Sequence, residues 1–212
     1  MPKMAARAPP LNPGKTAPMP MKIPFMKLMI DFFKISNPLT IKAYAKMIQY
    51  RLKSNSKDVL VVYKWTYQTE IGPITIGAND HSITYLKTSD TCVGELKETE
   101  LIKNAYLQLA EYLSGNRQDF DLPLEPGGTK FQQDVWLVSC QIPYGQTTTY
   151  KKLAELIGRP KAIRAVGAAN GQNSIYIIIP CHRVIGSNGS LTGYGGGLDT
   201  KEKLLRLEGA KF

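Results

Sequence analysis

The stretch TTTYKKLAELIGRPKAIRAVGAANG, residues 147–171, decides how the C-terminal part of the chain folds. One of the threonines at its start can cap a helix, and Gly158 can end that helix. Pro160 can begin a second helix only two or three residues later. Two short helices joined by a tight, glycine-containing turn form a helix-turn-helix, a unit that commonly binds DNA. The sequence therefore predicts a DNA-binding fold in this part of the chain.

The flanking segments extend this unit to a winged-helix-like domain over residues 129–212. A buried helix is predicted over Lys130–Ser139, before the helix-turn-helix. The apolar run Ile175–Ile179 predicts a strand, and the glycine-rich loop that follows it would form a wing. A last helix is predicted over Thr200–Glu208.

Residues 61–125 indicate a separate α/β domain. Apolar and polar residues alternate between Val61 and Asp90, with Gly-Pro and Asn-Asp turns between short runs, which predicts a hairpin or a meander. Helical periodicity follows from Glu98 to Leu113. Proline and glycine gather in DLPLEPGG, residues 121–128, which we interpret as the linker between the two domains.

Charge is distributed unevenly along the chain. Residues 1–60 hold 11 Lys+Arg against 2 Asp, residues 61–143 hold 6 against 11 acidic residues, and residues 144–212 hold 10 against 4. The basic C-terminal part favours an anionic partner such as nucleic acid, although a merely solvated basic face would have the same composition. Six prolines and no acidic residue within residues 1–20 predict that residues 1–60 are a poorly ordered extension, with a short basic amphipathic helix near residues 41–53.

The composition also excludes several classes of protein. No apolar stretch approaches the roughly 18 residues that span a bilayer, so no membrane segment is expected. The three widely spaced cysteines, Cys92, Cys140 and Cys181, argue against a disulfide framework and for a reducing, intracellular compartment. Cys140 is expected in a helix core and Cys92 on a polar loop. The cysteines and histidines lack the spacing of a metal site, so neither a metal nor another cofactor is expected.

Thiol, imidazole and guanidinium groups end the apolar run in IIIPCHRV, residues 177–184. A thiol is a weak nucleophile until a neighbouring base or cation lowers its pKa, and His182 could act in this way on Cys181. Consecutive residues in a regular strand point to opposite faces, so this pairing requires the chain to leave strand geometry at Pro180. From these residues alone, a buried structural cysteine beside a surface histidine remains the alternative.

The motifs FQQDVW, IPYGQTTTY, RPKAIRAVGAANG, IPCHRV, LTGYGGG and LEG follow one another between Phe131 and Gly209. Together they closely resemble the O6-alkylguanine-DNA alkyltransferases, and a weaker similarity extends from Tyr63 to Glu125. The resemblance implies a ribonuclease-H-like α/β domain followed by a winged-helix-like domain. It also implies direct DNA repair, in which the alkyl group of O6-alkylguanine or O4-alkylthymine passes irreversibly from double-stranded DNA to a cysteine. Such a protein acts once, as a monomer, in the nucleus of a eukaryote or the cytoplasm of a bacterium.

The resemblance implies catalytic roles for four residues. Cys181 would accept the alkyl group, and His182 would take the thiol proton through a water. Glu208, 27 positions after Cys181, would orient the imidazole and balance its charge. Tyr150 would hydrogen-bond the flipped guanine and donate a proton to it as it leaves.

Further residues are implied to bind the DNA or to shape the pocket. They are Thr149, Arg164, Ala165, Ala168, Asn173, Tyr194, Gly195 and Lys201. Arg164 would replace the extruded base in the duplex, and the small alanines would let their helix approach a narrow minor groove. Asn173 would fix the backbone near the cysteine. Several relatives carry a serine at the position of Gly195, which leaves backbone N–H groups of residues 193–197 as the donors to the guanine oxygen here.

Two functions without alkyl transfer remain as alternatives. One is a lesion sensor that flips the damaged base and does not react, but such relatives replace the acceptor cysteine, and this chain has Cys181. The other is a helix-turn-helix regulator without chemistry.

Overall fold

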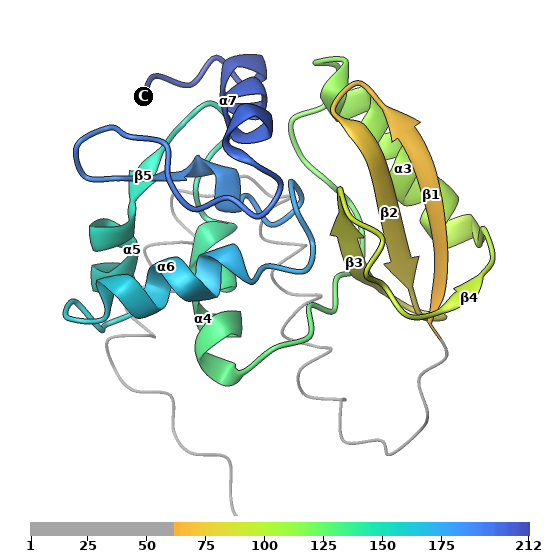
Figure 1. Ribbon diagram of the computed structural model, residues 1–212, viewed down its shortest axis with the longest axis horizontal. Helices are drawn as coiled ribbons and strands as arrows, with labels where there is room; N and C mark the ends of the chain where they lie inside the picture. The colour runs from red at the N-terminus through yellow and green to blue at the C-terminus, as the bar shows by residue number, and fades with distance from the viewer. Residues whose placement is uncertain (1–61) are drawn as a thin grey trace, which may run out of the picture.

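The structure, a computed structural model, describes residues 62–212, which form two lobes (Figure 1). The predicted N-terminal extension and its amphipathic helix lie outside the described residues. The elements of the first lobe are β1 (Tyr63–Thr69), β2 (Gly72–Ala78), β3 (Ile83–Lys87), β4 (Glu95–Leu96) and α3 (Glu100–Leu113). The elements of the second lobe are α4 (Lys130–Ser139), β5 (Thr148–Thr149), α5 (Tyr150–Leu156), α6 (Ile163–Gly171), the 3₁₀ turn η1 (Cys181–Arg183), β6 (Val184–Ile185) and α7 (Leu198–Leu207).

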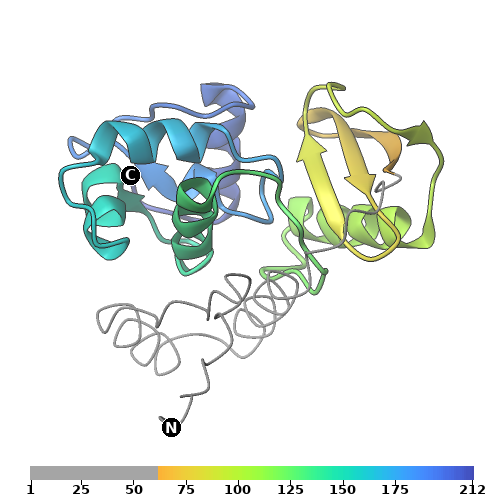
Figure 2. The same ribbon diagram turned by 90° about the horizontal axis from the view of Figure 1, so that it is seen from below.

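The first lobe is a four-stranded sheet with one helix on it. The strand order is β3-β2-β1-β4; β1 and β2 form an antiparallel hairpin, and β4 runs parallel to β1. Figure 2 shows α3 lying across one face of the sheet. The side chains of Ile74 and Ile76 on β2 are buried together with Ile102 and Leu109 of α3. The predicted hairpin and helix are therefore confirmed, and burial of this apolar face stabilises the lobe.

Two helix starts in the structure follow from capping side chains. The Thr99 hydroxyl accepts a hydrogen bond from the backbone N–H of Ile102, so α3 begins at Glu100, two residues after the predicted start. Thr129 and Gln132 form a reciprocal capping box at the start of α4, which spans Lys130–Ser139 as predicted.

The helix-turn-helix is confirmed, with one correction. Thr149 caps α5 by accepting from the Lys152 N–H, and Gly158 follows the helix end with φ 72°. The second helix, α6, does not begin at Pro160 but at Ile163, because residues 159–162 close a turn in which the Ala162 N–H donates to the Arg159 carbonyl. The indole N–H of Trp136 donates to the Ala169 carbonyl at 2.7 Å and joins α4 to α6.

The predicted strand at Ile175–Ile179 is wrong. Only Ile175 makes a β-bridge; the chain then turns, with the Ile179 N–H donating to the Ile175 carbonyl. Ile177 has φ 71°, a left-handed conformation that is unfavourable for a β-branched residue. A short apolar run does not distinguish a buried strand from a buried turn, because both exclude polar side chains.

The two lobes are joined through the outer edge of β3. The β3 residue Ile83 bonds to the linker, donating to the Pro123 carbonyl and accepting from the Glu125 N–H. Farther along β3, the Leu86 N–H donates to the Ser174 carbonyl and the Leu86 carbonyl accepts from the Tyr176 N–H, each at 2.8 Å. The edge of the first lobe thus holds the turn that precedes Cys181.

The last segment brings the chain back beside the helix-turn-helix. β6 pairs in parallel with β5, so Val184 lies opposite Thr148 directly before α5. The final helix α7 spans Leu198–Leu207, and so begins two residues earlier and ends one residue earlier than predicted. No helix within residues 62–212 is long and apolar enough to cross a membrane.

Candidate active site

Cys181 lies at the start of η1, directly after the turn, with 2% of its surface exposed. Pro180 does take the chain out of strand geometry, with φ −81° and ψ 59°. The side-chain N–H of Asn173 donates to Sγ of Cys181 at 3.1 Å and to the Ile179 carbonyl at 2.9 Å. Asn170, on α6, donates to the Cys181 carbonyl at 3.1 Å. Two asparagine side chains therefore hold both the thiol and its backbone.

The Cys181 thiol is protonated at neutral pH in this environment. Burial raises its pKa to about 11, against the opposing effects of the Asn173 hydrogen bond and the charges of Lys201 and Lys87. The Asn173 N–H stabilises the thiolate once it forms, because a hydrogen bond to an anion is stronger than one to a neutral thiol.

His182 and Glu208 form a fully buried pair beside this cysteine. Nε2 of His182 lies 3.0 Å from Oε1 of Glu208. Burial lowers the pKa of His182 despite the carboxylate, so the imidazole is neutral at pH 7. Burial alone would raise the pKa of Glu208, but hydrogen bonds from His182 and Arg183 hold it at about 2. Because an ionised carboxylate only accepts, Nε2 carries the proton and Nδ1 keeps a free lone pair.

Nδ1 of His182 is therefore available to accept a proton. It is buried and has no hydrogen-bond partner among the residues that the structure describes. Within that part of the chain no hydrogen bond joins it directly to Sγ of Cys181, which is consistent with proton transfer through a bridging water.

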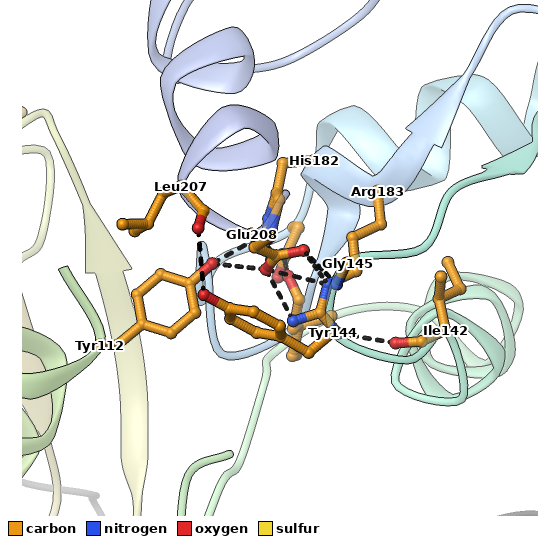
Figure 3. A network of polar contacts seen from close by, with 10 residues as sticks. Tyr112, Ile142, Tyr144, Gly145, His182, Arg183, Leu207 and Glu208 are labelled. Atoms are coloured by element: carbon orange, nitrogen blue, oxygen red, sulfur yellow. Dashed lines mark hydrogen bonds and ion pairs between the residues drawn. The ribbon is translucent and has the colours of Figure 1, made fainter. Parts of the chain in front are cut away.

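Arg183 is a member of this network that the sequence analysis did not assign. Its guanidinium donates to Glu208 from Nε at 3.0 Å and 3.1 Å and from Nη2 at 2.8 Å, and its Nη1 donates to the Ile142 carbonyl at 2.6 Å (Figure 3). A buried arginine needs a counter-charge. The position of Arg183 between apolar segments, after Ile175–Ile179 and before Val184, is therefore a sequence signal that could have indicated this ion pair.

Tyr112, from α3 of the first lobe, is a second residue that the sequence analysis missed. Its hydroxyl donates to Oε1 of Glu208 at 2.6 Å and lies 3.5 Å from Nε2 of His182 (Figure 3). The backbone N–H of Gly145 donates to the other carboxylate oxygen at 3.2 Å. Tyr112 precedes Glu208 by 96 residues and lies on an ordinary amphipathic helix, so no local signal indicates its role.

We expect Tyr112→Phe to slow proton transfer from Cys181 to His182 by about tenfold, because a donor to the Glu208 carboxylate is lost and the carboxylate then orients His182 less firmly. A residue that only fills space would be replaced by phenylalanine without effect on the rate. The check is the rate at which the Cys181 thiol reacts, measured against pH; for the variant the rate should be lower and its pH profile should shift along the pH axis. Tyr144→Phe is the control, since the Tyr144 hydroxyl donates at 3.3 Å to the Leu207 carbonyl and not to Glu208.

Tyr150 and Lys201 both hold the loop that follows β6. The Tyr150 hydroxyl donates to the carbonyls of Thr192 and Gly193, at 2.9 Å and 3.4 Å. The buried ammonium of Lys201 donates to the carbonyls of Thr192 and Val184, at 2.7 Å and 2.6 Å. Burial lowers the pKa of Lys201 to about 8. In this structure both side chains therefore fix the position of the loop after β6.

Five further implied residues lie in three places. Tyr194 is buried near the His182–Glu208 pair, with its ring centroid 6.4 Å from that of His182. Arg164, Ala165 and Ala168 are exposed on one face of α6, away from the buried Val166 and Ala169. The Thr149 hydroxyl is occupied as the cap of α5.

Similarity to known proteins covers both lobes. The ribonuclease-like domain of 6-O-methylguanine DNA methyltransferase matches residues 62–126, and the DNA binding domain of the same protein matches residues 130–210. The chain is 48% identical over 147 residues to a methylated-DNA–protein-cysteine methyltransferase of Methanosarcina barkeri, covering 66% of this chain and 93% of that protein. It is 45% identical over 148 residues to a protein of the same name from Mycolicibacterium paratuberculosis, covering 68% of this chain and 90% of that one.

Solved structures agree with these similarities. The crystal structure of the O6-methylguanine methyltransferase of Mycobacterium tuberculosis superposes with a TM-score of 0.65 at 42% identity, covering 70% of this chain and 93% of that chain. The crystal structure of OGT from the same organism in complex with DNA gives a TM-score of 0.63 at 45% identity, covering 69% and 92%.

Proposed function

The chain belongs to the O6-alkylguanine-DNA alkyltransferase family, DNA repair enzymes that transfer an alkyl group from DNA to a cysteine of their own, and we propose that Cys181 is the acceptor. The observation that carries this assignment is the buried His182–Glu208 pair, which leaves Nδ1 of His182 as a free base next to Cys181. Of the three cysteines only Cys181 is directly followed by a histidine; Val93 follows Cys92 and Gln141 follows Cys140.

The proposed reaction is a single displacement. Nδ1 of His182 takes the proton of the Cys181 thiol, through a water, as Sγ attacks the alkyl carbon. The S–C bond forms while the bond between that carbon and the guanine oxygen breaks, and its electron pair stays on the guanine. Tyr150 donates a proton to the leaving base, which restores neutral guanine. Glu208 stabilises the imidazolium that forms, in the manner of a nucleophile–base–carboxylate triad.

The proposed substrate is double-stranded DNA that contains O6-alkylguanine, and secondarily O4-alkylthymine. Because Cys181 is buried, the damaged nucleotide must leave the base stack to reach it. The exposed face of α6 supports this step: Arg164 projects from it as a long cation, and Ala165 and Ala168 leave the helix surface low enough to enter a minor groove. The loop at Tyr194 and Gly195 would wall the pocket that receives the base.

Further properties follow from the same proposal. The four catalytic residues come from one chain, which supports a monomer. A displacement by a thiolate needs no cofactor, and a thiol that must stay reduced supports an intracellular compartment, the nucleus or the bacterial cytoplasm. We place the boundaries of the two domains at residues 61–125 and 129–212.

Peptide mass mapping after incubation with O6-methylguanine DNA tests the acceptor assignment. We expect the peptide that contains Cys181 to gain one methyl group, with none on the peptides of Cys92 and Cys140. Binding of the DNA without any methylated peptide would instead support a lesion sensor.

We expect Arg164→Ala to slow repair of O6-methylguanine in duplex DNA by about 10- to 100-fold, because extrusion of a nucleotide costs a few kcal/mol that the inserted arginine offsets. Transfer from the free modified base, which needs no extrusion, should change little. Single-turnover rates with both substrates measure the difference. Arg206→Ala removes an exposed arginine from α7 and is the charge-matched control. Equal losses with both substrates would contradict a role of Arg164 in flipping.

A further inference from the structure

The loop that follows β6 carries a tight turn at residues 186–190, with an Asn-Gly pair at its tip. The Gly186 N–H donates to the Ser190 carbonyl at 2.9 Å, and the Gly189 N–H donates to the Gly186 carbonyl at 3.0 Å. Asn188 and Gly189 are both exposed, and Gly189 has φ 81°. A Cβ atom added to Gly189 would meet no atom of the described residues within 4 Å, so the pair faces open space.

Ser190 holds the side-chain amide of Asn188. Its backbone N–H donates to Oδ1 of Asn188 at 3.2 Å, and its hydroxyl donates to the same oxygen at 2.7 Å. A Cβ atom at Gly186 would lie only 2.8 Å from this oxygen, so the glycine leaves room for the amide. Two donors on one carbonyl oxygen stabilise the negative charge that forms there when the carbon is attacked. Cγ of Asn188 is therefore activated toward a nucleophile.

The backbone nitrogen of Gly189 is that nucleophile, because its attack on Cγ of Asn188 closes a succinimide ring. Glycine favours this step, since it has no side chain to hinder the nitrogen or to restrict the backbone. The N–Cγ bond forms, the bond between Cγ and Nδ2 breaks, and Nδ2 leaves as ammonia with the proton of the Gly189 nitrogen. Water then opens the ring at either carbonyl, which gives aspartate or isoaspartate. The Gly189 N–H must first leave the Gly186 carbonyl, and exposed turns open at low free-energy cost.

A second Asn-Gly pair, Asn170–Gly171, provides an internal comparison. Asn170 is only 1% exposed, and its side-chain N–H donates to the Cys181 carbonyl at 3.1 Å. Gly171 is the last residue of α6, so the helix holds its backbone nitrogen. The two pairs have the same chemistry in an unfolded chain and differ in the folded one, where Asn170 is protected and Asn188 is not.

We propose that Asn188 deamidates spontaneously and that the carboxylate formed weakens the binding of DNA by the second lobe. This inference goes beyond the proposed function, because it requires binding of DNA but no alkyl transfer. Residues 144–212 hold 10 Lys+Arg against 4 acidic residues, and a new carboxylate in this basic part repels the phosphates of a duplex. Isoaspartate also adds a methylene to the main chain just ahead of Thr192, whose carbonyl Tyr150 and Lys201 hold.

Peptide mass mapping of the full chain tests the modification. Trypsin cleaves after Arg164, Arg183 and Lys201, so the two Asn-Gly pairs fall on separate peptides, residues 165–183 and 184–201. After incubation without DNA at mildly alkaline pH, we expect conversion of an amide to an acid to be at least about tenfold faster in residues 184–201, with isoaspartate at position 188. In urea the two pairs should convert at similar rates. Equal conversion of the two peptides in the folded protein would overturn the proposal.

Two variants test how the site works. Asn188→Gln should leave residues 184–201 unmodified, because glutamine must close a larger ring. Ser190→Ala keeps the Asn-Gly pair but loses the hydroxyl donor, and should slow conversion by about fivefold, the rate equivalent of one lost hydrogen bond. An unchanged or faster rate in Ser190→Ala would contradict the activation of Cγ by Ser190.

The effect on DNA is measured with Asn188→Asp, which reproduces the charge of the product. Fluorescence anisotropy with an undamaged duplex at low salt should show about fivefold weaker binding than wild type, and the difference should shrink as salt screens the added charge. Asn188→Gln stays neutral and should bind as wild type does. Equal affinities of the aspartate and glutamine variants would refute an effect of the charge. The duplex contains no lesion, so failure of Cys181 to accept an alkyl group would leave this result unchanged.

Discussion

Cys181→Ser should abolish alkyl transfer while leaving the affinity for alkylated DNA nearly unchanged. Serine is slightly smaller than cysteine and can accept the same hydrogen bond from Asn173, so the turn and η1 should keep their geometry. An alcohol is far less acidic than a thiol, and His182 cannot generate an alkoxide from it at neutral pH. We expect the rate to fall by more than about 10³-fold, as for other enzymes that lose their nucleophile.

Two measurements on one sample of the variant check this result: the mass of the peptide that contains position 181 after incubation with O6-methylguanine DNA, and the fluorescence anisotropy of the labelled duplex. Cys140→Ser is the matched control, because Cys140 is the C-cap of α4 and packs against the same core, and a glutamine rather than a histidine follows it in the sequence. Joint loss of transfer and binding in the Cys181 variant would indicate a folding role. Methylation of the Cys181→Ser protein at another cysteine would refute the assignment.

The protonated state of Cys181 suits a group that reacts once. Thiolates are oxidised more readily than thiols, and oxidation of the proposed acceptor would inactivate the protein without repairing DNA. Burial raises the pKa of this thiol to about 11 and covers the sulfur, so the sulfur is shielded from oxidants in this structure. The hydrogen bond from Asn173 and the nearby lysines then favour the thiolate only as the reaction proceeds.

The parts of the fold that were predictable from the sequence have local causes. Thr149 caps the start of α5, and Gly158 adopts a left-handed conformation just after its end. Both effects act within one turn of helix, so they can be recognised in the sequence. The apolar run Ile175–Ile179 predicts a strand but forms part of a turn, because the geometry of residues 175–181 depends on partners that are distant in the sequence. Asn173 and the edge of β3 hold it, and neither contact is visible in the apolar run itself.

The site was predictable to the extent that its residues lie in motifs. Cys181, His182 and Glu208 were implied by the resemblance, and the structure brings them together. Tyr112 could not be found in this way, because its contact with Glu208 depends on how the two lobes are joined.

Glu208→Gln should lower the free energy of unfolding at neutral pH by about 3–5 kcal/mol, the usual cost of removing one partner of a buried ion pair. The carboxylate accepts hydrogen bonds from His182, Tyr112, Gly145 and Arg183, and its side chain is fully buried. The glutamine side chain would leave the charge of Arg183 without its buried counter-charge. Its own N–H groups would also face the groups that donate hydrogen bonds to the carboxylate. Urea unfolding at neutral pH measures the loss.

The pH dependence of the same variant separates lost charge from lost packing. Because the folded pKa of Glu208, about 2, lies below its ordinary value of 4.5, its ionisation stabilises the fold fully above pH 4.5 and progressively less as the pH falls through 2. That shift corresponds to about 3 kcal/mol, so the stability gap between wild type and variant should narrow by about 2 kcal/mol from neutral pH to pH 3.

Glu202→Gln is the control for this experiment. Glu202 lies on the same helix and pairs with Arg206 at 2.7 Å, but both side chains are exposed, so its loss should cost no more than about 1 kcal/mol. If the difference in unfolding free energy between wild type and Glu208→Gln stays constant between neutral pH and pH 3, the amide destabilises the fold through altered packing. The charge of the carboxylate would then not be the source of its stabilising interaction with Arg183. If the difference narrows, the buried charge of Glu208 stabilises the fold, and this charge belongs to the same carboxylate that lies 3.0 Å from Nε2 of His182.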